Sequence, residues 1–332
     1  MPKHRSGRPF AGATVAPGCP RGVASAVPAP GRPRDRVPRT AGAAASATMD
    51  DVATPTLITV APTGAETAKA DAPALPVTLD ELVATAKACE AAGAALIHVH
   101  IRDAEASPTL DLARLTDTVA ALREGTDLVV QLSTGGAVTD PYENRLRVID
   151  ALPDSCSLTC GTVNFGSDVF LNPWDFMVEL YRKTQALEIV PEFELFDVGH
   201  VAALNRLLDK EGLPYGGHVH CDLVLGVPGG APGTPDAALT MARMLPAGAS
   251  WSATGVGRST LPVALTSLAA GGHLRVGMED TLTYAPGRPV RDNAELVERA
   301  ATLAALALRP PMSTDEARST LGIKDRRNGA GA

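Results

Sequence analysis

The sequence predicts an α/β protein whose folded part, residues 54–324, is a closed (β/α)8 TIM barrel. Eight short apolar runs alternate with eight segments of helical periodicity, which is the element order of such a barrel. The turn after the first run reads APTGAE and lacks the G-x-G-x-x-G pattern of a dinucleotide-binding sheet. An open doubly wound sheet is therefore the second choice.

The predicted strands are short runs rich in apolar and β-branched residues, and the predicted helices have clear ends. The strands cover 57–61, 95–101, 128–132, 155–160, 189–196, 219–225, 250–253 and 273–277. The helices cover 79–92, 111–124, 141–150, 174–187, 199–211, 235–245, 260–270 and 294–307, and a short extra helix, 314–321, follows. Thr78 and Glu81 have capping-box spacing, Pro235 opens a helix, and Gly93 follows one.

The two ends of the chain differ in composition from the barrel. Residues 1–49 hold eight of the 30 Lys and Arg residues but one of the 37 Asp and Glu residues, in an Arg/Pro/Ala-rich segment without periodicity. Such a segment cannot bury a core, so we expect a disordered extension, and a natural start at Met49 is our hypothesis. Residues 325–332 are expected to form a disordered tail.

Composition excludes several classes of protein. Once the basic extension is set aside, the remaining chain is clearly acidic, which argues against nucleic acid as a partner. No apolar run reaches 18 residues, so no membrane span is expected. The five cysteines are scattered and form no C-x-x-C pair, which suits a reducing cytoplasm.

The run ALIHVHIRD places two histidines on one face of an apolar strand. His98 and His100 are two residues apart, so their side chains point to the same side. Barrel enzymes carry their reacting groups at the carboxyl ends of the strands, where this pair lies. The pair therefore indicates half of a metal site, against the alternative of two buried structural histidines.

The end of the eighth strand offers a third ligand. The run GGHLRVGMED places Glu279 and Asp280 directly after this strand. In a closed barrel, only the first strand lies between the eighth strand and the second, which carries His98 and His100. A catalytic zinc ion takes three protein ligands and keeps one position open. Glu279 is the predicted third ligand, and Asp280 would then be free to act as a base.

Polar side chains recur at the same end of other predicted strands. They are Glu66 after the first strand, Ser133 after the third, Ser157, Thr159 and Asn164 at the fourth, Glu192 and Glu194 on the fifth, and Arg275 on the eighth. Each has a structural explanation when taken alone, such as a buried carboxylate bound by backbone N–H groups. Their convergence at one end favours an active site, because every buried polar group needs partners.

A second H-x-H pair tests this rule. His218 and His220 precede the apolar run of the sixth strand, so strand direction places them at the opposite end of the barrel. We predict a structural role for both. The same prediction applies to His200 and to His273, which opens the eighth strand.

Several motifs together resemble the β-keto acid cleavage enzymes. The segments that carry the resemblance are TVAPTGAE, GAALIHVHIRD, VVQLSTGGAV, GTVNFGSDVFLN, VPEFELFDVGH, LVLGVPGG, WSATGVGR and GGHLRVGMED. They run in order from about residue 57 to 321. The resemblance implies a Zn2+-containing (β/α)8 barrel, a homotetramer, and an acyltransferase that converts a β-keto acid and acetyl-CoA to acetoacetate and a new acyl-CoA.

The resemblance also implies roles for individual residues. It gives His98, His100 and Glu279 as metal ligands, Arg275, Asp280 and Glu194 as catalytic residues, and Glu66, Ser133, Gly136, Ser157 and Thr159 as substrate contacts. The chain departs from the family at Thr159 and Thr281, where Asn is common, and mildly at Ser157, where Thr also occurs.

Glu66 bears on the choice of substrate. An acid at this position resembles the members that act on amino-bearing substrates, since a carboxylate complements an ammonium group. The expected substrate is 3-keto-5-aminohexanoate or a similar cationic β-keto acid, as in catabolism of the lysine-fermentation type.

Two other functions remain open from the residues alone. A metal-dependent hydrolase of the amidohydrolase kind also uses H-x-H in a barrel, but on the first strand and with further histidine ligands. A non-catalytic barrel with a structural metal is the other alternative, although structural zinc sites usually have four protein ligands.

Overall fold

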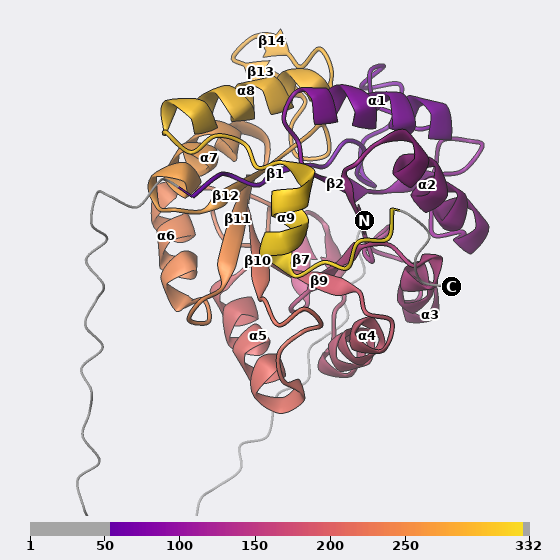
Figure 1. Cartoon of the computed structure of the whole chain (residues 1–332), viewed down its shortest axis with the longest axis vertical. Coiled ribbons are helices and arrows are strands. Elements are labelled where there is room, and N and C mark those ends of the chain that lie inside the picture. Colours follow the sequence, from indigo (N-terminus) through magenta and orange to yellow (C-terminus); the bar gives the residue numbers. More distant parts are fainter. Residues whose placement is uncertain (1–53, 328–332) are drawn as a thin grey trace, which may run out of the picture. The chain divides into compact units, whose positions relative to one another are not determined.

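Eight parallel strands close into a barrel within residues 54–327, the part of the chain that the computed structural model describes (Figure 1). Around the ring they are β1 (Ile58–Val60), β2 (Leu96–Val99), β5 (Val129–Leu132), β6 (Ser155–Thr159), β9 (Val190–Leu195), β10 (His220–Leu225), β11 (Ser250–Gly255) and β12 (His273–Val276). β12 pairs with β1 and closes the ring. The predicted TIM barrel is confirmed, and each predicted strand falls on one of these eight.

The helices surround the barrel in chain order. They are α1 (Leu79–Ala91), α2 (Leu112–Gly125), α3 (Tyr142–Arg147), α4 (Trp174–Ala186), α5 (Val198–Glu211), α6 (Pro235–Met244), α7 (Thr260–Ala269) and α8 (Asn293–Leu306). The predicted capping box of Thr78 and Glu81 starts α1. The predicted helix 141–150 divides into α3 and a 3-10 turn, Val148–Ala151, which ends where Leu152 has a φ of +52°.

A ninth helix, α9 (Thr314–Leu321), closes the amino-terminal end of the barrel (Figure 1). Its buried Ala317 and Leu321 belong to an apolar cluster with Leu57 and Leu96, which lie where β1 and β2 begin. Arg318 donates hydrogen bonds to the carbonyl groups of residues 127 and 128, just before β5. Because this end is sealed, access to the barrel lies at the carboxyl ends of the strands.

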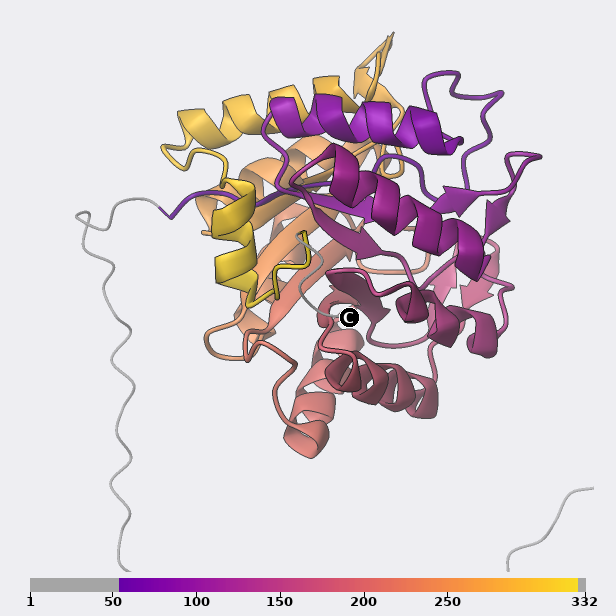
Figure 2. The same ribbon diagram turned by 45° about the vertical axis from the view of Figure 1, so that its right-hand side comes forward.

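Three small antiparallel ribbons, which the sequence did not predict, lie in the loops that follow β2, β6 and β12. They pair β3 (Ile101–Arg102) with β4 (Pro108–Thr109), β7 (Val163–Phe165) with β8 (Asp168–Phe170), and β13 (Thr283–Ala285) with β14 (Arg288–Pro289). Figure 2 shows β3–β4 and β7–β8 at the right of the barrel, away from α9. Strands of two or three residues are too short to give a periodic signal.

The predictions for the chain ends meet the described residues only in part. The extension 1–49 and its start at Met49 lie outside them, as do residues 328–332. Residues 325–327 of the predicted tail are described, and Arg327 forms ion pairs with Asp315 at 2.6 Å and Asp127 at 3.3 Å. Within the described range, no helix combines the length and apolar character needed to cross a membrane.

Candidate metal and substrate site

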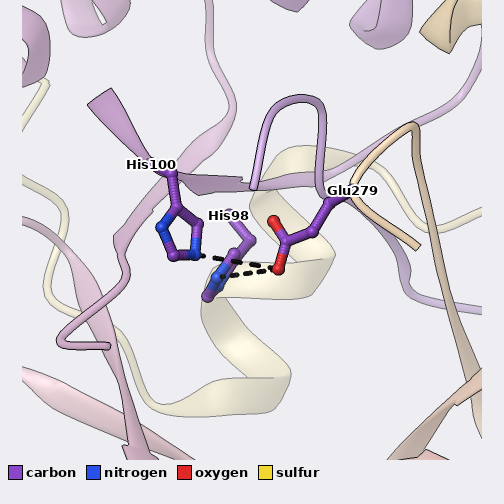
Figure 3. Close-up of side chains that lie close together, drawn as sticks. All are labelled: His98, His100 and Glu279. Atoms are coloured by element: carbon purple, nitrogen blue, oxygen red, sulfur yellow. Dashed lines mark ion pairs between the residues drawn. The ribbon is translucent and has the colours of Figure 1, made fainter. Parts of the chain in front are cut away.

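Three predicted ligands converge at the carboxyl end of the barrel. His98 lies on β2, His100 follows that strand, and Glu279 follows β12 on the other side of β1. Nε2 of His98 lies 3.9 Å and Nε2 of His100 lies 3.7 Å from Oε1 of Glu279 (Figure 3). Among residues 54–327, these three side chains form the group that could hold a metal ion, because their ligand atoms all lie within 4.8 Å of one another.

The donor set fits a divalent metal. Ligand atoms about 2.1 Å from a tetrahedral zinc ion lie about 3.4 Å from each other, close to the separations between Glu279 and the two imidazoles. Oε2 of Glu279 is buried and has no hydrogen-bond partner among the described residues. Two imidazole nitrogens and one carboxylate are also the donor types of a catalytic zinc site with one open position.

Gln131, which sequence reasoning missed, fixes the orientation of His98. Its Oε1 lies 2.5 Å from Nδ1 of His98, and its Nε2 donates to Oγ of Ser155 at 3.2 Å. Because the amide nitrogen is engaged by Ser155, the amide oxygen faces His98 and accepts the Nδ1 proton. Nε2 of His98 then carries the lone pair that a metal needs. One polar residue in the apolar run LVVQL was the available signal.

Arg275 is the centre of a buried charge cluster beside the three ligands. Its guanidinium lies 2.5 Å from Glu279, 3.2 Å from Glu194 and Asp280, and 3.7 Å from Asp222. Burial alone would lower the pKa of Arg275, but these carboxylates raise it well above its usual value. Arg275 therefore contacts both of the other predicted catalytic residues, Asp280 and Glu194.

The two carboxylates that follow β12 have opposite pKa shifts. Burial raises the pKa of Asp280 to about 6, with a further contribution from Glu279 and opposition from Arg275. Burial acts in the same direction on Glu279, but Arg275, His100 and His98 outweigh it and hold the pKa at about 2. Glu279 is thus the ionised member, as a metal ligand must be, and Asp280 lies nearer to its titration point.

Asp222 is a second residue that sequence reasoning missed. It lies fully buried on β10, in register with Glu194 on β9. The hydroxyl group of Thr254 lies 2.9 and 2.7 Å from its two carboxylate oxygens. Burial raises the pKa of Asp222 well above its usual value. A single acid in the apolar run CDLVLGV was the signal for this residue.

A cavity of about 430 Å³ opens over the ligands and contains most of the predicted substrate contacts. Glu66, Ser133 and Gly136 line it together with His100 and Arg275. Gly136 has a φ of +58°, and a Cβ atom there would lie 2.1 Å from Oδ2 of Asp140, so this position requires glycine.

Two of the predicted substrate contacts lie outside the lining of this cavity. Oγ of Ser157 accepts a hydrogen bond from the backbone N–H of Thr134 at 3.2 Å. The hydroxyl group of Thr159 donates to Glu194 at 2.9 Å. The structure therefore places both beneath the site, where they hold a loop and a carboxylate. Their contact with substrate stays a prediction.

The second H-x-H pair lies at the start of β10, at the closed end of the barrel. Nε2 of His220 lies 3.4 Å from Glu192, and its Nδ1 lies 2.7 Å from Oγ of Ser250, which also contacts His218. These partners satisfy the rings within the protein. The position of the pair agrees with the structural role predicted from strand direction.

Comparison with known proteins identifies the family. The chain matches the beta-keto acid cleavage enzyme family over residues 55–323. It is 36% identical over 273 residues to the 3-keto-5-aminohexanoate cleavage enzyme of Acetoanaerobium sticklandii, covering 80% of this chain and 98% of that protein. It is 32% identical over 274 residues to the 3-oxoadipate:acetyl-CoA acetyltransferase of Cupriavidus necator, covering 81% and 95%.

A solved structure supports the fold independently. The apo structure of ObcA matches with a TM-score of 0.66 at 20% sequence identity, covering 76% of this chain and 66% of that one. At this identity the likeness bears on the barrel alone. The family match covers almost the whole described range, and it agrees with the family that the motifs from APTGAE to GMED resemble. The chain therefore belongs to the beta-keto acid cleavage enzyme family.

Proposed function

We propose that this chain catalyses the acetyl-CoA-dependent cleavage of a β-keto acid, with acetoacetate and a new acyl-CoA as products. The observation that carries the proposal is the donor set of His98, His100 and Glu279 at the edge of a cavity that also contains Arg275 and Asp280. The names of the relatives support it, since they include a β-keto acid cleavage enzyme and an acetyl-CoA acetyltransferase.

His98, His100 and Glu279 would hold Zn2+, which would act as a Lewis acid toward the keto acid. Asp280 takes a proton from C2 of the keto acid, and Arg275 holds the Asp280 carboxylate in place. The C2 carbanion attacks the acetyl thioester carbon, and the C–S bond of the thioester breaks to release the CoA thiolate. This thiolate then adds to the C3 ketone, and the C2–C3 bond breaks to leave the new acyl-CoA. The electrons of that bond stay on C2 of acetoacetate, which regains a proton from Asp280.

The charge of the cavity supports a cationic substrate. Its acidic lining residues are Glu66, Asp168, Glu194, Glu279 and Asp280, whereas Arg275 is the arginine among its lining residues. Glu66 is exposed at the mouth, where an ammonium group could reach it. We therefore propose 3-keto-5-aminohexanoate or a similar amino-bearing β-keto acid as the substrate.

Metal analysis and product analysis together test the proposal. The purified full chain is analysed for bound metal by mass spectrometry, then incubated with acetyl-CoA and neutral, anionic and cationic β-keto acids. We expect about one zinc per chain, and acetoacetate with the matching acyl-CoA, formed fastest from the amino-bearing acid. His98→Ala should lose both metal and turnover.

Other outcomes separate the alternatives. Release of a free carboxylic acid without consumption of acetyl-CoA would indicate a hydrolase. Bound zinc without turnover of any keto acid would indicate a scaffold. A clear preference for anionic or purely aliphatic keto acids would leave the reaction standing but contradict the role of Glu66.

A further inference from the structure

A small apolar cluster, separate from the main hydrophobic clusters of the barrel, lies at the substrate cavity. Its members are Val138, Val163, Phe165, Phe170, Phe196, Val224, Val227 and Val256. All of them except Val163 line the cavity. Apolar side chains beneath a loop often have no role beyond holding that loop in place. These side chains, however, line an open cavity, which is typical of a ligand pocket.

The apolar lining and the candidate metal ligands come from different arcs of the barrel. The candidate metal ligands and Arg275 come from β12 and β2 and the loops that follow them, which flank β1. The apolar residues come from strand β10 and from the loops after β5, β6, β9, β10 and β11. A molecule that reacts beside Glu279 and Arg275 therefore faces this apolar wall with its other end.

The cluster residues that line the cavity are called the wall below, and three of them are phenylalanines. Of these three, Phe165 is the one that is not fully buried. Its ring packs edge-to-face on Phe170 and Phe196, with centroids 6.3 and 6.1 Å away. Phe170 and Phe196 are 7% and 6% exposed, whereas Phe165 is half-buried. Its remaining exposed area is what an apolar ligand would cover.

The wall behind Phe165 is held firmly. The guanidinium of Arg145 packs on the ring of Phe170 at 4.6 Å and donates to the carbonyl oxygen of Leu171 at 2.7 Å. Phe196 in turn packs edge-to-face on His200, with centroids 6.2 Å apart. Because its neighbours are fixed, the size of residue 165 determines how much space the wall leaves.

We propose that this wall receives the carbon chain of the β-keto acid, and that Phe165 sets the chain length accepted. The inference rests on the proposed function and extends it to the substrate side chain. The pantetheine arm of acetyl-CoA is the competing occupant, but its amide groups need hydrogen-bond partners that valine and phenylalanine side chains do not supply. The methylene and methyl groups of the carbon chain need none, and each buried methylene strengthens binding about fourfold. An ammonium group on that chain would have to face an acidic lining residue, Glu66 or Asp168, and not the wall.

Chain-length profiles of variants test the inference. We would measure kcat/KM with acetyl-CoA for 3-oxopentanoate, 3-oxohexanoate and 3-oxooctanoate in wild type, Phe165→Ala and Phe165→Trp. Phe165→Ala should raise the ratio of longest to shortest substrate at least tenfold, and Phe165→Trp should lower it. The KM for acetyl-CoA should stay within twofold in both. Val169→Ala is the matched control, since Val169 lies on the same ribbon, is 45% exposed and does not line the cavity.

The outcomes distinguish this inference from the proposed function. A changed KM for acetyl-CoA with an unchanged chain-length ratio would overturn it in favour of the pantetheine arm. Wild-type protein that turns over no keto acid would refute the proposed function. Calorimetric titration with the same three acids then tests the wall by itself, because Phe165→Ala must still shift binding towards the longest acid. Thermal melting of each variant verifies folding, and Phe165→Leu replaces any variant that does not fold.

Discussion

At the scale of single residues, the candidate site depends on side chains that hold other side chains. Gln131 holds His98, Thr159 holds Glu194, and Arg275 lies among four carboxylates. A buried guanidinium with several carboxylates is stable only while the partners remain, because removal of one leaves an uncompensated charge. Substitutions in these supporting residues should therefore impair the site although none of them is a metal ligand.

Gln131→Leu should weaken metal binding by about 10- to 100-fold, because His98 loses the acceptor that fixes its tautomer and ring orientation. The measurement is a competition titration against a chelator of known zinc affinity, which requires no turnover. Gln185→Leu is the control, since this glutamine lies on α4 and contacts the carbonyl group of Leu213. Equal affinities for the Gln131 and Gln185 variants would show that His98 does not depend on Gln131.

Asp280→Asn should lower kcat by about 10²- to 10⁴-fold, because an amide of the same shape cannot accept the proton. The bound metal should not change, since Asp280 is not one of the three ligands. Steady-state kinetics and metal analysis of the same preparation check both statements. Asp236→Asn, at an exposed position on α6, serves as the control, and an undiminished kcat in the Asp280 variant would assign the base elsewhere.

At the scale of elements, Arg145 of α3 joins two loops that build the cavity. Its Nε donates to the carbonyl oxygen of Thr134 at 2.8 Å, and its Nη2 donates to Oδ1 of Asn172 at 2.5 Å. Its guanidinium is also stacked on Phe176, whose ring centroid lies 4.4 Å away. Arg145 thus couples the loop after β5 to the ribbon β7–β8 and α4.

Arg145→Met should lower the free energy of unfolding by about 2–5 kcal/mol, because it leaves several buried oxygens without donors. It should also speed hydrogen exchange in the ribbon β7–β8. Urea unfolding and hydrogen–deuterium exchange measure the two effects. Arg206→Met is the matched control, since Arg206 is exposed over the ring of Trp174 and its loss should cost less than about 1 kcal/mol. Similar losses in both variants would contradict the coupling role.

The elements also show how far sequence reasoning reaches. The periodic signal was strong enough for the eight barrel strands and α9, and strand direction separated His98 and His100 from His218 and His220. The ribbons were missed because two or three residues carry no period. The roles of Gln131 and Asp222 were missed because they depend on register between strands, which places Gln131 opposite His98. The position of Ser157 and Thr159 near the end of a strand likewise did not reveal that both side chains form hydrogen bonds within the protein.

At the scale of the whole molecule, the barrel divides into a closed end and a reactive end. Titratable side chains are buried at both, and those at the closed end bear on stability. His273 is one of them: it is 5% exposed, and its Nδ1 accepts the backbone N–H of Leu57 at 3.1 Å. The homotetramer implied by the family resemblance stays a prediction, as do the cytoplasmic location and the domain limits.

Burial, with His220 and Arg309 nearby, lowers the pKa of His273 to about 3, against an ordinary value of 6.5. Between these two pKa values the His273 imidazole binds a proton in the unfolded chain but not in the folded protein. The free energy of unfolding therefore falls as the pH drops from about 6.5 towards 3. His273→Gln should reduce this slope by up to about 1.4 kcal/mol per pH unit. Urea unfolding between pH 4 and 8 measures it. Parallel stability profiles for variant and wild type would show that His273 does not titrate in this way.

The seal formed by α9 also bears on the order in which the protein can be completed. α9 is the last helix within residues 54–327, and it packs against Leu57, near the first described residues. Thr56 bridges to Pro311, and Arg309 donates to the carbonyl group of residue 54, so the two ends of the barrel sequence are joined directly. A nascent chain cannot close this end of the barrel until residues 314–321 have emerged from the ribosome. The apolar cluster that contains Leu57 and Leu96 therefore stays uncovered by α9 until then, and an unfinished chain can meet other chains through it.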